Sequence, residues 1–213
     1  MNIAQLNRKF TLDTISLLAL AIFSLVAIQS CTAMGNGATV AQSPIEPAPV
    51  VTPVATPAAE TIVTMNLTDE TGVGEAVGTV TLKDAEYGLM ITPNLTDLSP
   101  GIHGFHVHAN AACGPGEKDG KVVPGLAAGG HYDPAETGSH EGPYGDGHLG
   151  DLPPLYIDAD GNATTPTLAP RLTVADVSNR ALMIHLDGDN FSDEPAALGG
   201  GGARLACGVI KLE

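Results

Sequence analysis

The chain has 213 residues, 43% of them hydrophobic, so it can form one domain with a packed core and still carry additional segments. A formal net charge of −15 makes nucleic acids and anionic membranes poor partners for the bulk of its surface. Aromatic residues are only 4% of the chain, whereas 26 glycines and 16 prolines indicate many turns, which favours short strands over a helical bundle.

Residues 1–30 have the pattern of a signal peptide. Arg8 and Lys9 form a positive start, and residues 15–28 follow as an almost wholly apolar run. This run is shorter than the roughly 20 residues that a membrane-spanning helix needs. The sequence IQSC then resembles a bacterial lipobox, although its glutamine departs from the small residue usual there. We therefore expect a lipid anchor at Cys31; the alternatives are ordinary cleavage, giving a soluble secreted protein, and a retained single-span anchor.

The next segment, residues 31–60, is rich in proline, alanine and threonine. Its repeated prolines oppose both helix and central strand and favour an extended conformation. We interpret this segment as a disordered tether that holds a domain away from a membrane.

Residues 61–213 are expected to form one all-β domain. Short β-patterned runs between turn signals predict eight strands, at residues 61–68, 75–83, 88–93, 102–108, 154–158, 163–168, 181–186 and 205–211. No clear amphipathic helix accompanies them, so an antiparallel sandwich or barrel is predicted. Two segments, 109–153 and 187–204, do not fit strands, and loops of that length are usually functional.

The histidines are the main chemical signal, because all seven lie between residues 103 and 185. His106 and His108 lie two positions apart on a predicted strand, so they point to the same face and can chelate one ion. A pair of surface histidines is the alternative. His185 lies on another predicted strand, where a lone histidine is more often a core residue than a ligand.

A second set of candidate ligands follows in the first long loop: His131, His140, His148 and Asp151. Three imidazoles and one carboxylate are suited to tetrahedral zinc. The loop has too little apolar content to order itself by burial, so a bound metal is a physical reason for it to be ordered. A flexible acidic loop with scattered histidines is the alternative.

Five motifs occur in the same order as in copper/zinc superoxide dismutases: GFHVH, GGHYDP, HLGDLP, MIHLDGDN and GGGGARLACGVI. The resemblance covers residues 61–213, and the sequence HEGPYGDGHLGDLP is most similar to the bacterial periplasmic branch. It implies an eight-stranded antiparallel Greek-key sandwich or barrel with two long functional loops. It also implies an enzyme that dismutates superoxide to O2 and hydrogen peroxide, in the periplasm or cell envelope, as a monomer or a homodimer.

The resemblance further implies which residues bind copper and zinc. Copper would be bound by His106, His108, His131 and His185. Zinc would be bound by His131, His140, His148 and Asp151. His131 would then bridge the two metals and hold a proton for the peroxide, while His103 would be a structural hydrogen-bonding residue. Competing functions are a copper-binding or copper-delivery module on the same fold and a zinc hydrolase, the latter disfavoured by four protein ligands that close the zinc site.

Other residues take roles from the same resemblance. Cys113 and Cys207 would form a disulfide, and Arg204 would lie beside copper and orient the anionic substrate. Asp193 is preferred over its neighbour Asp189 as the carboxylate that links a copper histidine to a zinc histidine. Two lysines of the first long loop are expected to steer superoxide inward, with ordinary exposed lysines as the alternative. They are Lys118 and Lys121.

Overall fold

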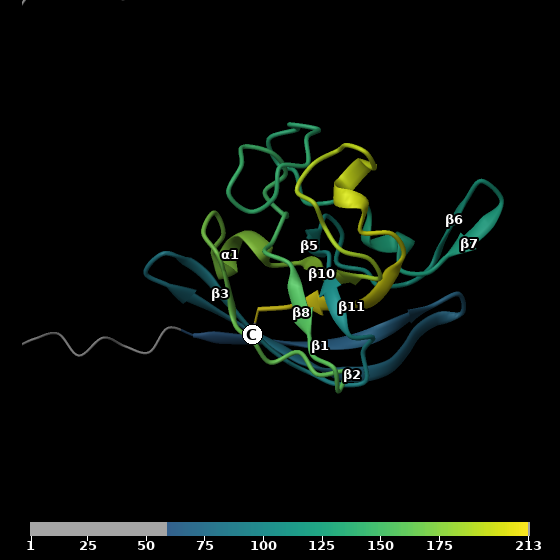
Figure 1. The fold of residues 1–213 in the computed structure, drawn as a ribbon, viewed down its shortest axis with the longest axis horizontal. Coiled ribbons are helices and arrows are strands. Elements are labelled where there is room, and N and C mark those ends of the chain that lie inside the picture. The colour runs from purple at the N-terminus through teal and green to yellow at the C-terminus, as the bar shows by residue number, and fades with distance from the viewer. Residues whose placement is uncertain (1–58, 213) are drawn as a thin grey trace, which may run out of the picture. The chain divides into compact units, whose positions relative to one another are not determined.

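The computed structural model describes residues 59–212, which form antiparallel β-structure with very little helix (Figure 1). The expected signal peptide, the expected lipid anchor at Cys31 and almost all of the expected tether lie outside the described residues. Within residues 59–212, none of the helices is long and apolar enough to cross a membrane.

Seven strands form one curled antiparallel sheet, in the order β5–β10–β11–β1–β2–β3–β9. Their bounds are β1 Glu60–Asp69, β2 Gly72–Ala85, β3 Gly88–Leu95, β5 Phe105–His108, β9 Thr167–Ala169, β10 Arg180–His185 and β11 Arg204–Ile210. Neighbours such as β1 and β11 are far apart in the chain, as Greek-key connections require. The predicted all-β antiparallel fold is confirmed.

Two shorter sheets accompany the large one. Strand β4 (Gly101–His103) pairs with β8 (Leu155–Ile157), and β6 (Gly116–Lys118) pairs with β7 (Lys121–Val123). The remaining elements are short: helix α1 at Val174–Val177 and two 3-10 turns, at Leu126–Ala128 and Ala197–Gly200. The β6–β7 hairpin projects from one side of the domain (Figure 1).

The strand predicted at residues 102–108 is in fact two strands, because the chain passes from one sheet to another at Gly104. Strand β4 pairs with β8, whereas β5 pairs with β10. The Gly104 backbone is engaged by a third segment: its N–H donates to Asp187 and its carbonyl accepts from His185, both at 2.8 Å. A side chain at this position would meet His106 at 3.2 Å, so glycine lets the two segments approach.

Two other predicted boundaries differ from the structure. The strand expected at residues 163–168 begins only at Thr167, and Ala163 makes a single bridge to Leu95. The loop expected at 109–153 contains the β6–β7 hairpin. Its turn residues Asp119 and Gly120 both have positive φ, 52° and 72°, and Asp-Gly is a strong hairpin signal that could have predicted it.

The hydrophobic core lies inside the curled sheet. Along β1, Val63 and Met65 are buried, whereas Ile62 and Thr64, which precede them, are exposed, the alternation that a half-buried strand requires. This core also contains residues of β2, β3, β5, β8, β10 and β11. A second buried cluster, which includes Cys113, Met183 and Cys207, lies where the first long loop packs on β10 and β11. The strands that carry the histidines are therefore supported on both sides.

Candidate metal centre

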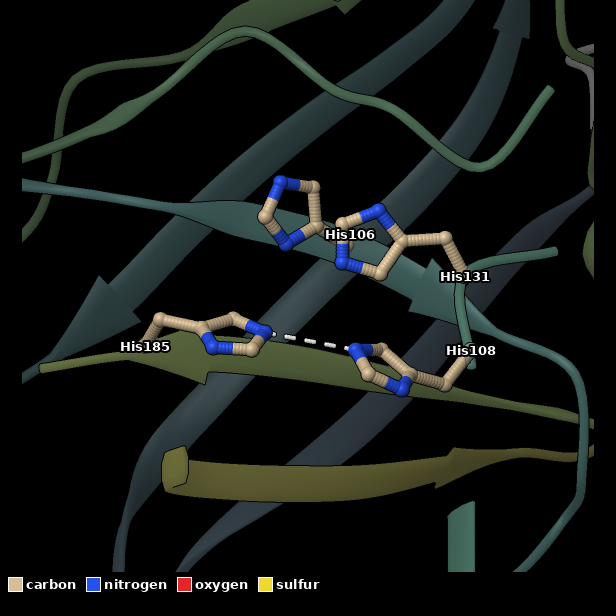
Figure 2. Close-up of side chains that lie close together, drawn as sticks. All are labelled: His106, His108, His131 and His185. Atoms are coloured by element: carbon tan, nitrogen blue, oxygen red, sulfur yellow. Dashed lines mark hydrogen bonds between the residues drawn. The ribbon is translucent and has the colours of Figure 1, made fainter. Parts of the chain in front are cut away.

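Four buried histidines meet beside the paired strands β5 and β10 (Figure 2). Their candidate ligand nitrogens all lie within 4.8 Å of one another. Two come from the same face of β5, one from the end of β10 and one from the first long loop, which reaches β5 through a bridge between His131 and His108. The first group therefore consists of His106, His108, His131 and His185.

A second group of candidate ligands adjoins the first and shares two of its histidines. It consists of His106, His131, His140 and Asp151. The Asp151 carboxylate is central: Oδ1 lies 2.9 Å from His131 Nδ1, and Oδ2 lies 2.9 Å from His140 Nδ1. The predicted ligand His148 lies outside this group, with Nδ1 3.5 Å from Asp151 Oδ1. The sequence thus predicted a set that the structure brings together, with His148 as its outermost member.

Four buried polar atoms around these groups have no hydrogen-bond partner: His106 Nδ1, His140 Nδ1, His148 Nδ1 and Asp151 Oδ2. Leaving such atoms unsatisfied costs about 1–3 kcal/mol each, so native structures rarely keep them without a purpose. A tetrahedral zinc ion holds its ligand atoms roughly 3.3 Å apart, given bonds of about 2.0–2.1 Å. The distances from the Asp151 carboxylate to His140 Nδ1, 2.9 Å, and to His148 Nδ1, 3.5 Å, fit that arrangement. The donor set is therefore suited to a metal ion.

Each histidine of β5 and β10 has one ring nitrogen held by the protein, which leaves the other for a metal. His108 Nδ1 is 2.9 Å from the Gly129 carbonyl, and His185 Nδ1 is 3.3 Å from the Gly202 carbonyl. Their Nε2 atoms face each other at 3.3 Å (Figure 2). Such contacts fix the tautomer and the ring orientation of a ligand before a metal binds.

The carboxylate that links the two groups is Asp189, so the prediction of Asp193 for this role is wrong. Asp189 Oδ2 lies 2.8 Å from His106 Nε2, and Oδ1 lies 2.8 Å from His140 Nε2. Asp193 is exposed and accepts instead from the backbone N–H groups of His140, at 2.8 Å, and Leu198, at 3.0 Å. Asp189 follows the end of β10 by four residues, but Asp187 lies closer still, so closeness to His185 does not single it out in the sequence.

Gly199 keeps the Asp189 link open. A Cβ atom at this position would lie 2.1 Å from Asp189 Oδ1 and 2.7 Å from His140 Nε2. The residue also has a φ of +73°, which disfavours other side chains. A larger side chain at position 199 would therefore disturb the contact between Asp189 and His140, which explains this glycine in the run of the second long loop.

The surroundings shift the histidine pKa values in opposite directions. Burial lowers the pKa of His106 to about 3 and that of His185 to about 4, since both rings lose access to water. Burial acts the same way on His140, but the carboxylates of Asp151 and Asp189 outweigh it and raise its pKa to about 9. The first group is therefore neutral and ready for a cation at pH 7, whereas His140 carries a proton in the metal-free protein.

Comparison with known proteins identifies the family. The model for copper/zinc superoxide dismutase matches residues 76–210, more than half of the chain. The chain belongs to the copper/zinc superoxide dismutase family. Its 155-residue match to superoxide dismutase [Cu-Zn] 2 of Salmonella typhimurium is 58% identical and covers 72% of this chain and 90% of that protein.

Solved structures agree with this assignment. The copper/zinc superoxide dismutase from Brucella abortus matches with a TM-score of 0.71 and 55% identity, over 72% of this chain and all of that one. The monomeric copper, zinc superoxide dismutase from Salmonella enterica matches with a TM-score of 0.66 and 57% identity, again over 72% of this chain.

Arg204 of this dismutase-family chain begins β11, opposite His185 of β10. Its guanidinium donates to the carbonyls of Gly125, at 2.8 Å, and Gly129. Gly129 also holds His108, so one peptide positions both a histidine and the arginine. Burial lowers the pKa of Arg204, although a guanidinium remains charged at neutral pH.

The disulfide predicted between Cys113 and Cys207 is confirmed. It joins the first long loop to β11, three residues beyond Arg204. The prediction that His103 is a hydrogen-bonding residue is also confirmed: its ring nitrogens lie 2.8 Å from the His185 carbonyl and 2.9 Å from the Ser99 carbonyl. It thus supports the end of β10 without belonging to either ligand group.

The predicted steering lysines lie opposite each other in the projecting hairpin. Lys118 of β6 pairs in register with Lys121 of β7, and both are exposed. Neither makes an ion pair among the described residues 59–212, where the one lysine ion pair joins Lys83 to Glu60. Their charges are therefore free to act on a solute.

Proposed function

We propose that this chain dismutates superoxide, converting two superoxide ions and two protons into O2 and hydrogen peroxide, with copper in the first group and zinc beside it. The observation that carries this function is a pair of adjoining ligand groups that share His106 and His131, in a chain of this family. Copper supplies one-electron chemistry because it changes oxidation state, and zinc supplies a fixed charge because it does not.

The proposed copper ligands are His106, His108, His131 and His185. The proposed zinc ligands are His131, His140, His148 and Asp151. Asp189 engages His106 at Nε2, which leaves Nδ1 for copper. The unpartnered Nδ1 of His148 then provides the fourth zinc ligand. With this assignment of ligands, each of the four buried atoms that lack a hydrogen bond would bind a metal.

His131 is proposed as the residue that holds a proton for the product. Its Nδ1 is engaged by Asp151 at 2.9 Å, so Nε2 is the atom available toward the first group. Burial lowers the pKa of His131, which favours a neutral ring in the metal-free protein. We therefore place the proton that peroxide needs on His131 Nε2.

Arg204 is proposed to bind and orient the substrate anion. It stands across from His185, and two of its guanidinium N–H groups are fixed by loop carbonyls. A guanidinium has five N–H donors in a planar fork. Donors therefore remain for a small anion, and their position is set in advance, as electrostatic stabilisation requires.

Variants of single ligands test this assignment. We expect His185→Asn to lose copper and the catalysed decay of superoxide while retaining zinc. His148→Asn should lower zinc content first, and metal analysis of the purified protein alongside the decay assay distinguishes the two. Equal loss of both metals in either variant would contradict two separately built sites.

We propose that Lys118 and Lys121 raise the local concentration of superoxide. A chain with a net charge of −15 repels an anion overall, so the two lysine ammonium groups would have to offset that repulsion locally, beside the exposed carboxylates of Glu117 and Asp119 on the same hairpin. The support is the exposure of both lysines on one hairpin and their freedom from ion pairs within the described residues.

We propose that the protein is exported and held in the bacterial cell envelope by a lipid on Cys31. The support is the positive start, the apolar run and the lipobox-like sequence. A periplasmic or secreted site also suits the disulfide, which needs an oxidising compartment. Mass spectrometry of the mature N-terminus tests this: a lipidated Cys31 is expected, and an unmodified N-terminus downstream of it would contradict the anchor.

We further propose that the protein forms a homodimer through the β4–β8 face. Ile102 and Tyr156 lie opposite each other there and are 52% and 51% exposed. Pairing two copies would cover this apolar pair. Sedimentation should give a dimer that Ile102→Lys dissociates, whereas a monomeric unaltered protein, like the Salmonella enterica relative, would contradict the proposal.

A further inference from the structure

One arginine outside both ligand groups binds the loop that carries His148. Arg171 donates from Nε to the Pro143 carbonyl at 3.1 Å and from Nη1 to the Gly147 carbonyl at 3.0 Å. Its Nη2 donates to the carbonyls of Gly142, at 3.1 Å, and His148. A guanidinium has five N–H donors in one plane, so residues 142–148 curve around a single side chain that satisfies four of their carbonyls.

The backbone of Arg171 is held between the edge of the large sheet and the hydrophobic core. It lies two residues beyond β9, whose last residue Ala169 pairs with Leu89 of β3. The next residue, Leu172, is 2% exposed and belongs to the hydrophobic core. The guanidinium is therefore a fixed point to which the loop is attached.

Other support for this loop comes from the buried Pro143 and from the Asp146 N–H, which donates to the Glu141 carboxylate at 3.0 Å. Tyr144 is 74% exposed, and the segment contains three glycines. The His148 peptide is held from two sides: its N–H donates to the Ser139 carbonyl at 2.9 Å, and its carbonyl accepts from Arg171. Without Arg171, the main remaining restraint on the His148 carbonyl is the 3.3 Å contact from the Asp151 N–H.

Three of the four proposed copper histidines depend on a different kind of support. His106 and His108 lie within β5, and His185 ends β10, so the antiparallel ladder holds their backbones. None of the hydrogen bonds of Arg171 within the described residues reaches these strands. A change at position 171 should therefore affect the zinc half of the centre and leave the copper half in place.

We infer that Arg171 is a positioning residue for zinc: it fixes the backbone of residues 142–148 so that His148 Nδ1 stands in its ligand position before the metal binds. The inference rests on the proposed zinc ligands. Residues that orient a metal ligand from outside typically change metal affinity by about 10–100-fold when they are removed.

The test uses the metal-free protein and three variants. Arg171→Ala removes all four bonds, and Arg171→Lys keeps the charge but not the planar fork. Lys83→Ala is a control that removes one exposed positive charge, which pairs with Glu60 and not with residues 142–148. Zinc and copper dissociation constants are measured separately, by competition with a coloured chelator. The absorption spectrum of cobalt(II) in the zinc position reports on the ligand geometry.

We expect Arg171→Ala to weaken zinc binding about 10–100-fold, to alter the cobalt spectrum and to change copper binding less than about threefold. The zinc affinity of Arg171→Lys should fall between those of the Ala variant and the unaltered protein, since one ammonium reaches fewer carbonyls. This variant keeps the positive charge, so it provides the test if the Ala variant fails to fold. Lys83→Ala should bind both metals as the unaltered protein does.

Two results would overturn this inference alone: unchanged zinc affinity in both Arg171 variants, or equal weakening of copper and zinc, which would indicate a general loss of structure. Failure of the unaltered protein to bind zinc would overturn the proposed zinc ligands, and the inference with them.

Discussion

At the scale of single residues, the centre depends on carboxylates that each engage two histidines. Asp151 contacts His131 and His140, and Asp189 contacts His106 and His140. His140 thus has a carboxylate oxygen within 2.9 Å of each ring nitrogen, and these two negative charges raise its pKa although its ring is buried. Asp189 gives the two metal positions a connection in addition to His131.

Replacing Asp189 by asparagine should weaken zinc binding by about 10–100-fold, because an amide cannot accept from both His106 and His140 as a carboxylate does. Competition with a chelator measures this effect. Asp187→Asn is the matched control, since Asp187 is two residues away, exposed, and makes no side-chain hydrogen bond among the described residues. Equal effects of the two substitutions would contradict the special role of Asp189.

Zinc binding at pH 7 should release about one proton from His140, because a zinc ligand must give up the proton that a pKa of about 9 leaves on it. Copper binding should release almost none from His106 and His185, whose pKa values of about 3 and 4 keep them neutral. The apparent zinc affinity should accordingly fall as the pH falls below 9. Calorimetry in buffers of different ionisation enthalpy measures the protons, and zinc binding without proton release at pH 7 would contradict the His140 assignment.

At the scale of elements, two long loops are fixed to a rigid sheet at a few defined points. The disulfide attaches the first loop to β11, and Arg204 attaches the same loop through Gly125 and Gly129. Asp193 of the second loop holds the His140 backbone in the first. The loops thus bring ligands to strands whose own positions are set by the core.

Replacing both Cys113 and Cys207 by serine should lower the free energy of unfolding by roughly 4–5 kcal/mol, because the bridge closes a loop with a sequence separation of 94 residues. Urea unfolding of the metal-free protein measures the change. Copper binding should also weaken, because the loop that carries Gly129 and His131 then loses its covalent attachment to β11. A loss below about 1 kcal/mol would show that the unfolded chain gains little freedom when the bridge is removed.

The elements that the sequence could predict are those with a local signal. Alternating apolar residues located most strands, and the spacing of His106 and His108 indicated their common face. The sheet change at Gly104 was missed because it depends on contacts with Asp187 and His185, which are distant in sequence. Asp189 was passed over for the same reason, since only the folded loop shows which carboxylate reaches both rings.

At the scale of the whole molecule, a strongly acidic chain is proposed to act on an anion. The formal charge of −15 and the free lysines of the projecting hairpin act in opposite directions on superoxide. Such fields are screened over about 8–10 Å at ordinary salt concentrations, so any steering must depend on ionic strength.

Neutralising Lys118 and Lys121 together as glutamines should lower the rate with superoxide and make its salt dependence less negative. Rates measured from low to high ionic strength give the slope. The double variant of Lys83 and Lys211 removes the same charge elsewhere and should lower the rate less. Identical slopes for the two double variants would contradict steering by the hairpin.

The most direct test of the whole account is one preparation of the unaltered protein, loaded with metals, in which bound copper and zinc are counted and superoxide decay is followed on the same sample. We expect one copper and one zinc per chain, and a decay rate that rises in proportion to bound copper and disappears in the metal-free protein. Stoichiometric copper and zinc without accelerated decay would contradict the enzymatic function and leave a metal-binding module on the same fold.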